Sequence, residues 1–319
     1  MNAIFYTVSA AEIKISVDEI QVLTESFREL QRTGLIRLAY DSERYLYLFI
    51  KRGKVLNAYL IASESKEPLP LENWVDWMKS AGDAYAKIIP LSSFGVLISK
   101  LLIQSENGEK EIFDHPSQLS EYCASCNESP KLSLIQLSWD NAMGAVFFSG
   151  VEKLPYSLFV SQEIIHDEAG VNDIFFKWNE PRCTVTTFTP VLSADAWQEY
   201  YLRQSFADIC NRTLSRFESM TGRALVDSLV RLVSIFASKN NLDINISSRK
   251  LIDREVFSSP QEAAQNYRQF LGEMFSHFSV VIGSRLLALT LREIVTSLPE
   301  YECEIIRRFE LLPEGYFYE

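Results

Sequence analysis

Short apolar stretches near the N-terminus alternate in a way that predicts three strands. Residues 35–40 and 44–51 are separated by DSE, and KRGK separates the second stretch from residues 55–61. Both separators are typical turn sequences, and Asp41 can bond its own backbone in the first. The stretch 44–51 is apolar at both sets of alternate positions. This strand is therefore either covered on both faces or offers an aromatic face to a partner.

Helical periodicity surrounds these strands. A stripe at three- and four-residue spacing predicts an amphipathic helix over residues 17–31, formed by Ile20, Leu23, Phe27 and Leu30. PLENWVDWMKSAG and SSFGVLISKLLIQ predict two further helices, and DAYAKIIPL predicts a strand between them. The polar, turn-rich SENGEKEIFDHP follows as a boundary. A first α/β module is therefore predicted over residues 1–111.

The same order of elements begins again 99 residues later. At this offset, matching residues are Leu35 with Leu134, Ile36 with Ile135, Leu38 with Leu137, Tyr40 with Trp139, Asp41 with Asp140, Phe49 with Phe148, and Lys54 with Lys153. The repeated order predicts an internal duplication, with a second, degenerate module over residues 112–194. The alternative is that two unrelated α/β segments have similar sequences because both are rich in strand-forming residues.

From residue 195 onward the pattern is helical. In RALVDSLVRLVSIFASKN the predicted buried stripe is Leu225, Leu229, Leu232 and Phe236. NLDINISSRKLIDREVFSSP reads as a connector with a short helix, and the next helix begins with a Ser259–Glu262 capping box. Residues 195–319 are therefore predicted to form an all-α helical bundle. The predicted fold is α+β: two small modules with antiparallel sheets, then this bundle.

Composition and charge narrow the classes of function. The 319 residues are 47% hydrophobic and 23% charged, which is typical of a globular protein. The net charge is −11 and no basic block is present, which argues against nucleic acid and anionic membrane as partners. The N-terminus has no secretory-signal pattern, and each long apolar stretch is shorter than a bilayer span. A cytoplasmic location without membrane insertion is expected.

Signatures of catalysis and of metal binding are weak. The closest glycines, Gly144 and Gly150, are six residues apart, which excludes a glycine-rich phosphate loop. Cys123 and Cys126 have the spacing of half a zinc site, but no second pair exists. A helix end with two small residues is the simpler interpretation. No cofactor and no metal are therefore predicted.

One polar cluster could still supply ligands or a general base. It lies in IIHDEAGVND and consists of His166, Asp167, Glu168 and Asp173. A polar loop between two strands is the alternative that we favour for this segment.

Three groups of aromatic residues are candidates for binding a partner protein. The first is the strand face of Tyr45, Tyr47 and Phe49, and the second is a helix ridge of Trp74 and Trp77. The third is the C-terminal tail, with Tyr316, Phe317 and Tyr318. For each group, the alternative is that its aromatic side chains pack inside the protein.

The first module resembles the PATAN family, named for the PatA N-terminus, over about residues 17–104. The resemblance lies in a helix leading to TGLIRL and in YLYLFIKRGKVLNAYL; the matching residues are Thr33, Gly34, Phe49, Gly53, Val55 and Ala58. The second copy departs from the pattern, because residues 127–130 replace the Thr-Gly and Pro155 interrupts the third strand. The resemblance implies a non-catalytic module of bacterial signalling proteins that regulate surface motility and patterning.

The hypothesis is therefore a bacterial signalling adaptor that is not an enzyme. Its partner would be another protein, such as a response regulator, a GTPase or a motor ATPase, and a homodimer is a further alternative. A second hypothesis is a small-molecule sensor or enzyme with a pocket between the modules that uses His166. A third is a roadblock-like regulator of a Ras-like GTPase, which rests on fold analogy alone.

Overall fold

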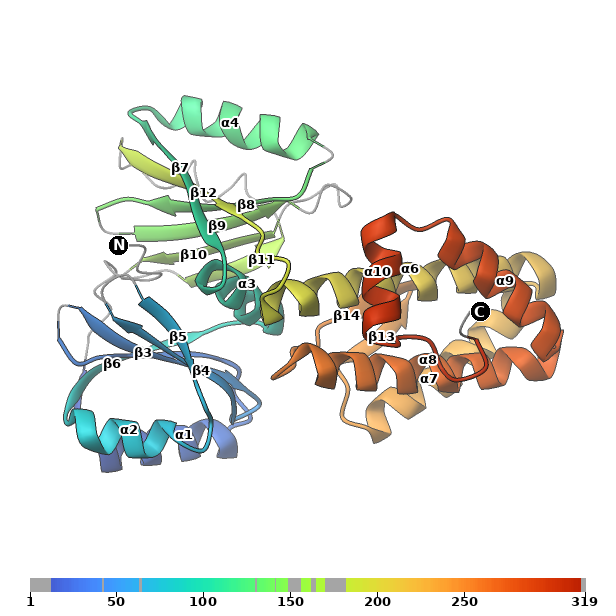
Figure 1. Ribbon diagram of the computed structural model, residues 1–319, viewed down its shortest axis with the longest axis horizontal. Coiled ribbons are helices and arrows are strands. Elements are labelled where there is room, and N and C mark those ends of the chain that lie inside the picture. The colour runs from blue at the N-terminus through green and yellow to red at the C-terminus, as the bar shows by residue number, and fades with distance from the viewer. Residues whose placement is uncertain are drawn as a thin grey trace. The chain divides into compact units, whose positions relative to one another are not determined.

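The computed structural model describes residues 13–316, except for residues 42, 63–64, 130, 141, 149–155, 162–164 and 170–181 (Figure 1). The chain divides into two compact units, residues 1–191 and residues 192–319. Each unit is described by itself.

The first unit contains two antiparallel six-stranded sheets. The first sheet and its helices are β1 (Ile13–Ile15), α1 (Val17–Glu29), β2 (Gly34–Ala39), β3 (Arg44–Lys51), β4 (Lys54–Ala62), β5 (Ser65–Leu69), α2 (Trp74–Ala81), β6 (Ala84–Pro90) and α3 (Ser93–Ile103). The second sheet and its helix are β7 (Glu106–Phe113), α4 (Pro116–Glu128), β8 (Ser133–Ser138), β9 (Ala142–Phe148), β10 (Tyr156–Ser161), β11 (Ile165–Ala169) and β12 (Cys183–Thr189).

The two sheets have the same topology. The first has the order β1-β6-β2-β3-β4-β5, and the second, read from its β7 edge, has the order β7-β12-β8-β9-β10-β11. Every strand of one sheet thus has a counterpart at the same place in the other. Antiparallel sheets followed by helices agree with the predicted α+β class. Duplication as the origin of the likeness stays a prediction.

The strand registers correct one of the predicted residue matches. Leu35 of β2 lies opposite Phe49 of β3, whereas Leu134 of β8 lies opposite Phe147 of β9. The turn between β8 and β9 is one residue shorter than the turn between β2 and β3. The counterpart of Phe49 is therefore Phe147, and the ungapped match with Phe148 is wrong.

Helices cover both faces of the first sheet. Alternate residues of β3, among them Leu46 and Leu48, form one core with Ile20 and Phe27 of α1 and Met78 of α2. A Ser16–Glu19 capping box fixes the start of α1. α3 packs against β2 and β3 on the opposite face (Figure 1).

α3 connects the two sheets of the first unit. Its residues 95–103 are all buried, as expected for a helix that is apolar on every side. At its start, the Phe94 ring lies 6.2 Å from the Phe147 ring and 4.5 Å from the Tyr156 ring. The Ser92 and Tyr156 hydroxyls are hydrogen-bonded at 2.8 Å. The second sheet therefore helps to bury the helix that follows the first.

The Thr-Gly and basic-Gly positions of the PATAN resemblance meet at one structural junction. The Arg52 N–H donates to Thr33 Oγ1 at 3.1 Å, and the Gly53 N–H donates to the Arg32 carbonyl at 2.7 Å. A Cβ on Gly53 would lie 1.9 Å from the Cα of Arg28, at the end of α1. These residues thus hold α1, the start of β2 and the β3–β4 turn together, and Gly53 has no room for a side chain.

The expected boundary around residue 111 is wrong, because the polar stretch there is a strand. β7 pairs with β12 along the edge of the second sheet, with Phe113 opposite Cys183. An edge strand needs few apolar side chains, which is why its sequence resembles a loop.

The second unit consists of helices and one β-hairpin. Its elements are α6 (Asp195–Thr221), α7 (Arg223–Lys239), β13 (Ile244–Ser247), β14 (Lys250–Asp253), α8 (Pro260–Ile282), α9 (Ser284–Thr296) and α10 (Glu300–Arg308). The hairpin corrects two expectations, the all-α bundle and the connector with a short helix. Its two-residue turn places Ser248 and Arg249 at φ of 49° and 64°, a backbone that Asn and Gly usually occupy. The turn therefore gave no recognisable sequence signal.

The α6–α7 and α8–α9 pairs are built alike. One glycine joins each pair, Gly222 at φ 85° and Gly283 at φ 83°, and these residues are 61 positions apart. Two aromatic contacts link α6 and α8 at the same spacing: Phe206 stacks on Tyr267 at 4.2 Å, and Phe217 stacks on Phe278 at 4.1 Å. The residue numbers of the paired rings increase in the same direction along both helices, so α6 and α8 run parallel. An approximate two-fold axis between them relates the two pairs.

The buried stripe of α7 differs from the predicted one. Val226, Leu229, Val233 and Ala237 are buried. Leu225 and Leu232 are exposed. The α6–α8 pair fixes which face of α7 turns inward, which periodicity alone could not decide.

Candidate binding groove between α6 and α9

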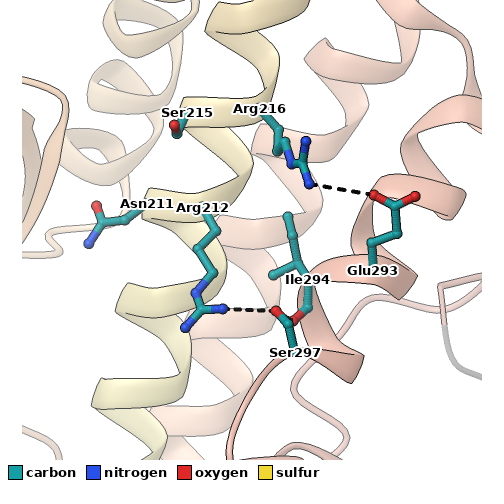
Figure 2. Close-up of a pocket in the computed structure, with 7 residues that line it drawn as sticks. All are labelled: Asn211, Arg212, Ser215, Arg216, Glu293, Ile294 and Ser297. Atoms are coloured by element: carbon teal, nitrogen blue, oxygen red, sulfur yellow. Dashed lines mark hydrogen bonds and ion pairs between the residues drawn. The ribbon is translucent and has the colours of Figure 1, made fainter.

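A groove of about 440 Å³ lies in the second unit between α6 and α9. It is lined from α6 by Asn211, Arg212, Ser215 and Arg216, and from the other side by Glu293, Ile294 and Ser297 (Figure 2). The two walls come from helices about 80 residues apart in the chain. They meet because α9 packs along α6.

Two arginines one helical turn apart dominate the α6 wall. Arg212 donates to the Ser297 hydroxyl at 2.8 Å and pairs with Asp208 at 3.5 Å. Arg216 pairs with Glu293 at 3.8 Å. Like charges four residues apart destabilise a helix slightly, so the two arginines do not by themselves stabilise α6.

The remaining wall residues give the groove an apolar floor and tie it to the hairpin. Ile294 is buried and lies between the two arginine contacts in Figure 2. Asn211 Oδ1 accepts a hydrogen bond from the Leu251 N–H of β14 at 2.8 Å. The Arg249 side chain also pairs with Glu218 of α6. The hairpin therefore holds the stretch of α6 that carries the arginines.

A buried carboxyl lies beside the Arg212 end of the groove. Glu302 of α10 is buried and accepts a hydrogen bond from the Tyr301 hydroxyl at 3.1 Å. Burial is the main cause that raises the pKa of Glu302 above its usual range, and the nearby charge of Asp208 adds to it. The charge of Arg212 lowers this pKa. Asp208 and Glu302 thus share one neighbouring cation, Arg212.

An ion pair buried inside the second unit anchors α6 to the hairpin and to α8. Arg203 lies 3.4 Å from the Asp253 carboxylate, and the Tyr267 hydroxyl donates to the same carboxylate. Burial alone would lower the pKa of Arg203, but the adjacent Asp253 raises it above its usual value. Burial also raises the pKa of Tyr267, and Asp253 adds to that rise. The guanidinium therefore stays charged and the phenol stays neutral.

Two further carboxylates fix the chain between the hairpin and α8. Glu199 of α6 accepts a hydrogen bond from the Phe257 N–H at 2.9 Å. Glu255 accepts one from the Asp243 N–H at 2.7 Å. Both carboxylates are buried. These contacts satisfy backbone donors that would otherwise be left in the interior. They join the start of α6 to the segment that leads into α8, and they join the two ends of the hairpin.

The aromatic strand face predicted to bind a partner is not exposed. Tyr45 is 6% exposed, and Tyr47 and Phe49 are fully buried. The Arg37 guanidinium lies 5.8 Å from the Tyr45 ring centre, and Phe49 packs edge-on against Tyr59 at 5.7 Å. The prediction of a contact surface here is wrong, because helices cover both faces of the first sheet.

The other aromatic candidates pack at least partly inside the protein. Trp74 and Trp77 are half-buried against the core of the first sheet, and Trp77 meets Tyr40 edge-on at 4.9 Å. Tyr316 is half-buried and lies 5.4 Å from Phe275 of α8, so the chain turns back onto the helices there. Phe317 and Tyr318 lie outside the described residues.

The polar cluster and the cysteine pair are placed on a strand and a helix. His166, Asp167 and Glu168 belong to the edge strand β11, which corrects the expected loop, and Asp173 lies outside the described residues. Cys123 is buried on α4, and burial raises the pKa of its thiol to about 12. Among the described residues, no three His, Cys, Asp or Glu side chains come together as a metal site.

Sequence reasoning missed the groove and its two arginines. NRTLSR places Arg212 and Arg216 four residues apart in a predicted helix. That like-charge pair was the one available signal, since it is unfavourable for an isolated helix. The acidic and apolar residues opposite could not be assigned to the same site without the packing of α9.

Comparison with known proteins returned no match: no protein-family model, no curated protein and no solved structure is significantly similar to the chain. The resemblance to the PATAN family therefore stays a prediction based on the residues quoted above. No helix within the described part of the chain is long and apolar enough to cross a membrane.

Proposed function

We propose that the protein is a signalling adaptor, without catalytic activity of its own, that binds a partner protein through the α6–α9 groove. The observation that supports this most directly is the pair Arg212 and Arg216, one turn apart on the groove wall. A guanidinium presents paired N–H donors that match a carboxylate, so two in succession suit two acidic side chains. We infer that the partner presents an acidic segment.

The contacts already in the groove favour such an exchange. Arg212 and Arg216 keep about half of their side-chain surface exposed (42% and 62%). Exposed ion pairs contribute at most about 1 kcal/mol, so a partner carboxylate can replace the Ser297 hydroxyl or Glu293 at small cost. Ile294, which is buried, forms the apolar floor between the two contacts.

The first unit supports the proposal through its two matching sheets. Their common strand order and similar registers favour an internal duplication that gave two tandem modules. Because the first module resembles the PATAN family, we infer that the adaptor acts in bacterial signalling, with a response regulator, a GTPase or a motor ATPase as partner. The sensor or enzyme with an inter-module pocket and the roadblock-like regulator remain alternatives, which no observation on the described residues favours.

Affinity capture from the native host, with charge-matched variants, tests the proposal. The tagged chain is compared with Arg212→Glu/Arg216→Glu and with Arg231→Glu/Lys239→Glu, which changes the charge equally on the exposed side of α7. We expect one specific protein to be captured by the wild type and the α7 variant and to be lost with the groove variant. Equal capture by all three folded chains would contradict a role for the groove.

A further inference from the structure

The end of the second unit where α6 and α8 stop has a symmetric construction. There the chain turns at Gly222 and Gly283, and a Cβ on either glycine would meet nothing within 4 Å. The Phe217 and Phe278 rings stack with an interplanar angle of 1° one and a half turns before these glycines. The approximate two-fold axis between α6 and α8 therefore passes through the surface at this end of the unit.

Exposed apolar side chains occupy equivalent positions on both sides of the axis. Met220 and Val281 are 42% and 46% exposed, and Leu225 and Leu286 are 45% and 44% exposed. Each pair is 61 residues apart, the spacing that relates the two helix pairs. Val280, at 85%, is the most exposed of these apolar residues. We call these five residues the apolar end.

We propose that the apolar end is a self-association surface that binds the apolar end of a second copy of this chain. The proposal is independent of the α6–α9 groove. This surface is nearly two-fold symmetric, so it presents similar residues on both sides of its axis. A second copy that meets it end to end can therefore place similar residues opposite each other. Closed, self-complementary contacts of this kind are the commonest in homo-oligomers.

The exposed area agrees with a weak to moderate dimer. Five partly exposed apolar side chains make a patch on the order of a few hundred Å², the size at which surface patches are often functional. Covering such a patch and its rim on two copies removes roughly 1,000 Å² from water, the lower limit for a specific interface. We therefore expect a dimer that dissociates in the micromolar range.

The charges at the rim suit a second copy of this chain, because both signs are present. Arg223 and Arg285 are exposed beside the two glycines. Asp227 lies 3.9 Å from Arg223 and offsets its charge. A lipid surface attracts an excess of cations, whereas a second copy can pair both signs across a two-fold contact. The mixed rim also lets two chains of net charge −11 approach at this end.

Sedimentation velocity on the full chain, from about 1 to 100 µM, tests the proposal. The variant Val280→Glu/Leu286→Glu puts two carboxylates into the apolar end. The control Leu232→Glu/Ile235→Glu changes two exposed apolar residues of α7, about 15 Å or more along the helix from Gly222. We expect the wild type and the control to dimerise alike, and the first variant to dissociate at least about 100-fold more easily.

Three outcomes would overturn the proposal. The first is a wild type that stays monomeric over the whole range. The second is a dimer that survives Val280→Glu/Leu286→Glu, with circular dichroism showing that the variant is folded. The third is a monomer that co-sediments with phosphatidylglycerol vesicles but not with phosphatidylcholine vesicles, which would assign the apolar end to a lipid surface.

Discussion

Single residues at close contacts carry a measurable part of the stability. Gly53 combines φ of 76° with a neighbouring backbone that a Cβ would approach to 1.9 Å, whereas Gly82 has φ of 87° and open space. Alanine at either position has an unfavourable backbone with positive φ, which costs about 1–3 kcal/mol. Only Gly53→Ala also forces the end of α1 to move.

We therefore expect Gly53→Ala to lower the free energy of unfolding by at least about 2 kcal/mol more than Gly82→Ala does. Urea denaturation followed by circular dichroism measures both. Equal losses would show that the backbone conformation alone matters, and that the junction of α1 with the β3–β4 turn is looser than described.

The raised pKa of Glu302 predicts how the stability of the folded chain depends on pH. Its pKa is raised above 4.5 in the folded chain, so the folded state holds this proton more tightly than the unfolded state does. Stability from this group is therefore greatest below its usual pKa and is lost as the pH rises through the raised value.

Glutamine at position 302 cannot ionise, so Glu302→Gln is expected to raise the urea midpoint at pH 8 and to have less effect near pH 4.5. The exposed Glu304 of the same helix gives the control, Glu304→Gln. A midpoint that is unchanged or lowered at pH 8 would contradict the described burial of Glu302 beside Asp208.

At the scale of elements, the hairpin β13–β14 holds strain in its turn. Ser248 and Arg249 both have positive φ, where a short polar residue such as Asn is better tolerated. We expect Ser248→Asn to stabilise the protein by about 0.5–1 kcal/mol, and Ser248→Val to destabilise it, because β-branched residues strongly disfavour this region. Thermal unfolding of both variants measures the difference. The same sign for both would argue against this turn geometry.

The hairpin is anchored by the pair of Arg203 with Asp253. Asp253→Asn removes the carboxylate and leaves a buried guanidinium beside a neutral amide, which we expect to cost about 3 kcal/mol. Tyr267→Phe removes one hydrogen bond to the same carboxylate and should cost about 1 kcal/mol. Urea unfolding of the two variants checks this order. The reverse order would show that the ion pair contributes less than the phenol.

Elements were predictable from sequence where the local pattern and the packing agree. The stripe of Ile20 and Phe27 predicted α1, and alternation with turn residues predicted β2 to β4. β7 and the hairpin were missed. An edge strand has few apolar residues, and the turn at Ser248 and Arg249 lacks the usual Asn-Gly signal.

At the scale of the whole molecule, the binding site was less predictable than the fold. The aromatic face of β3 was ambiguous because a strand that is apolar on both faces fits either full burial or a partner, and α3 decided for burial. The groove depends on Arg216 and Glu293 meeting across two helices that are far apart in the chain. Only the tertiary packing of α6 with α9 brings them together.

The central claim is that a partner protein occupies the α6–α9 groove. The most direct test is photo-crosslinking in the native host from a benzoylphenylalanine placed at Ser215, inside the groove, and at Ser228, on the exposed side of α7. The account predicts a covalent adduct with one protein from position 215, its loss when Arg212→Glu/Arg216→Glu is added, and no such adduct from position 228. No adduct from position 215, or the same adduct from both positions, would contradict it.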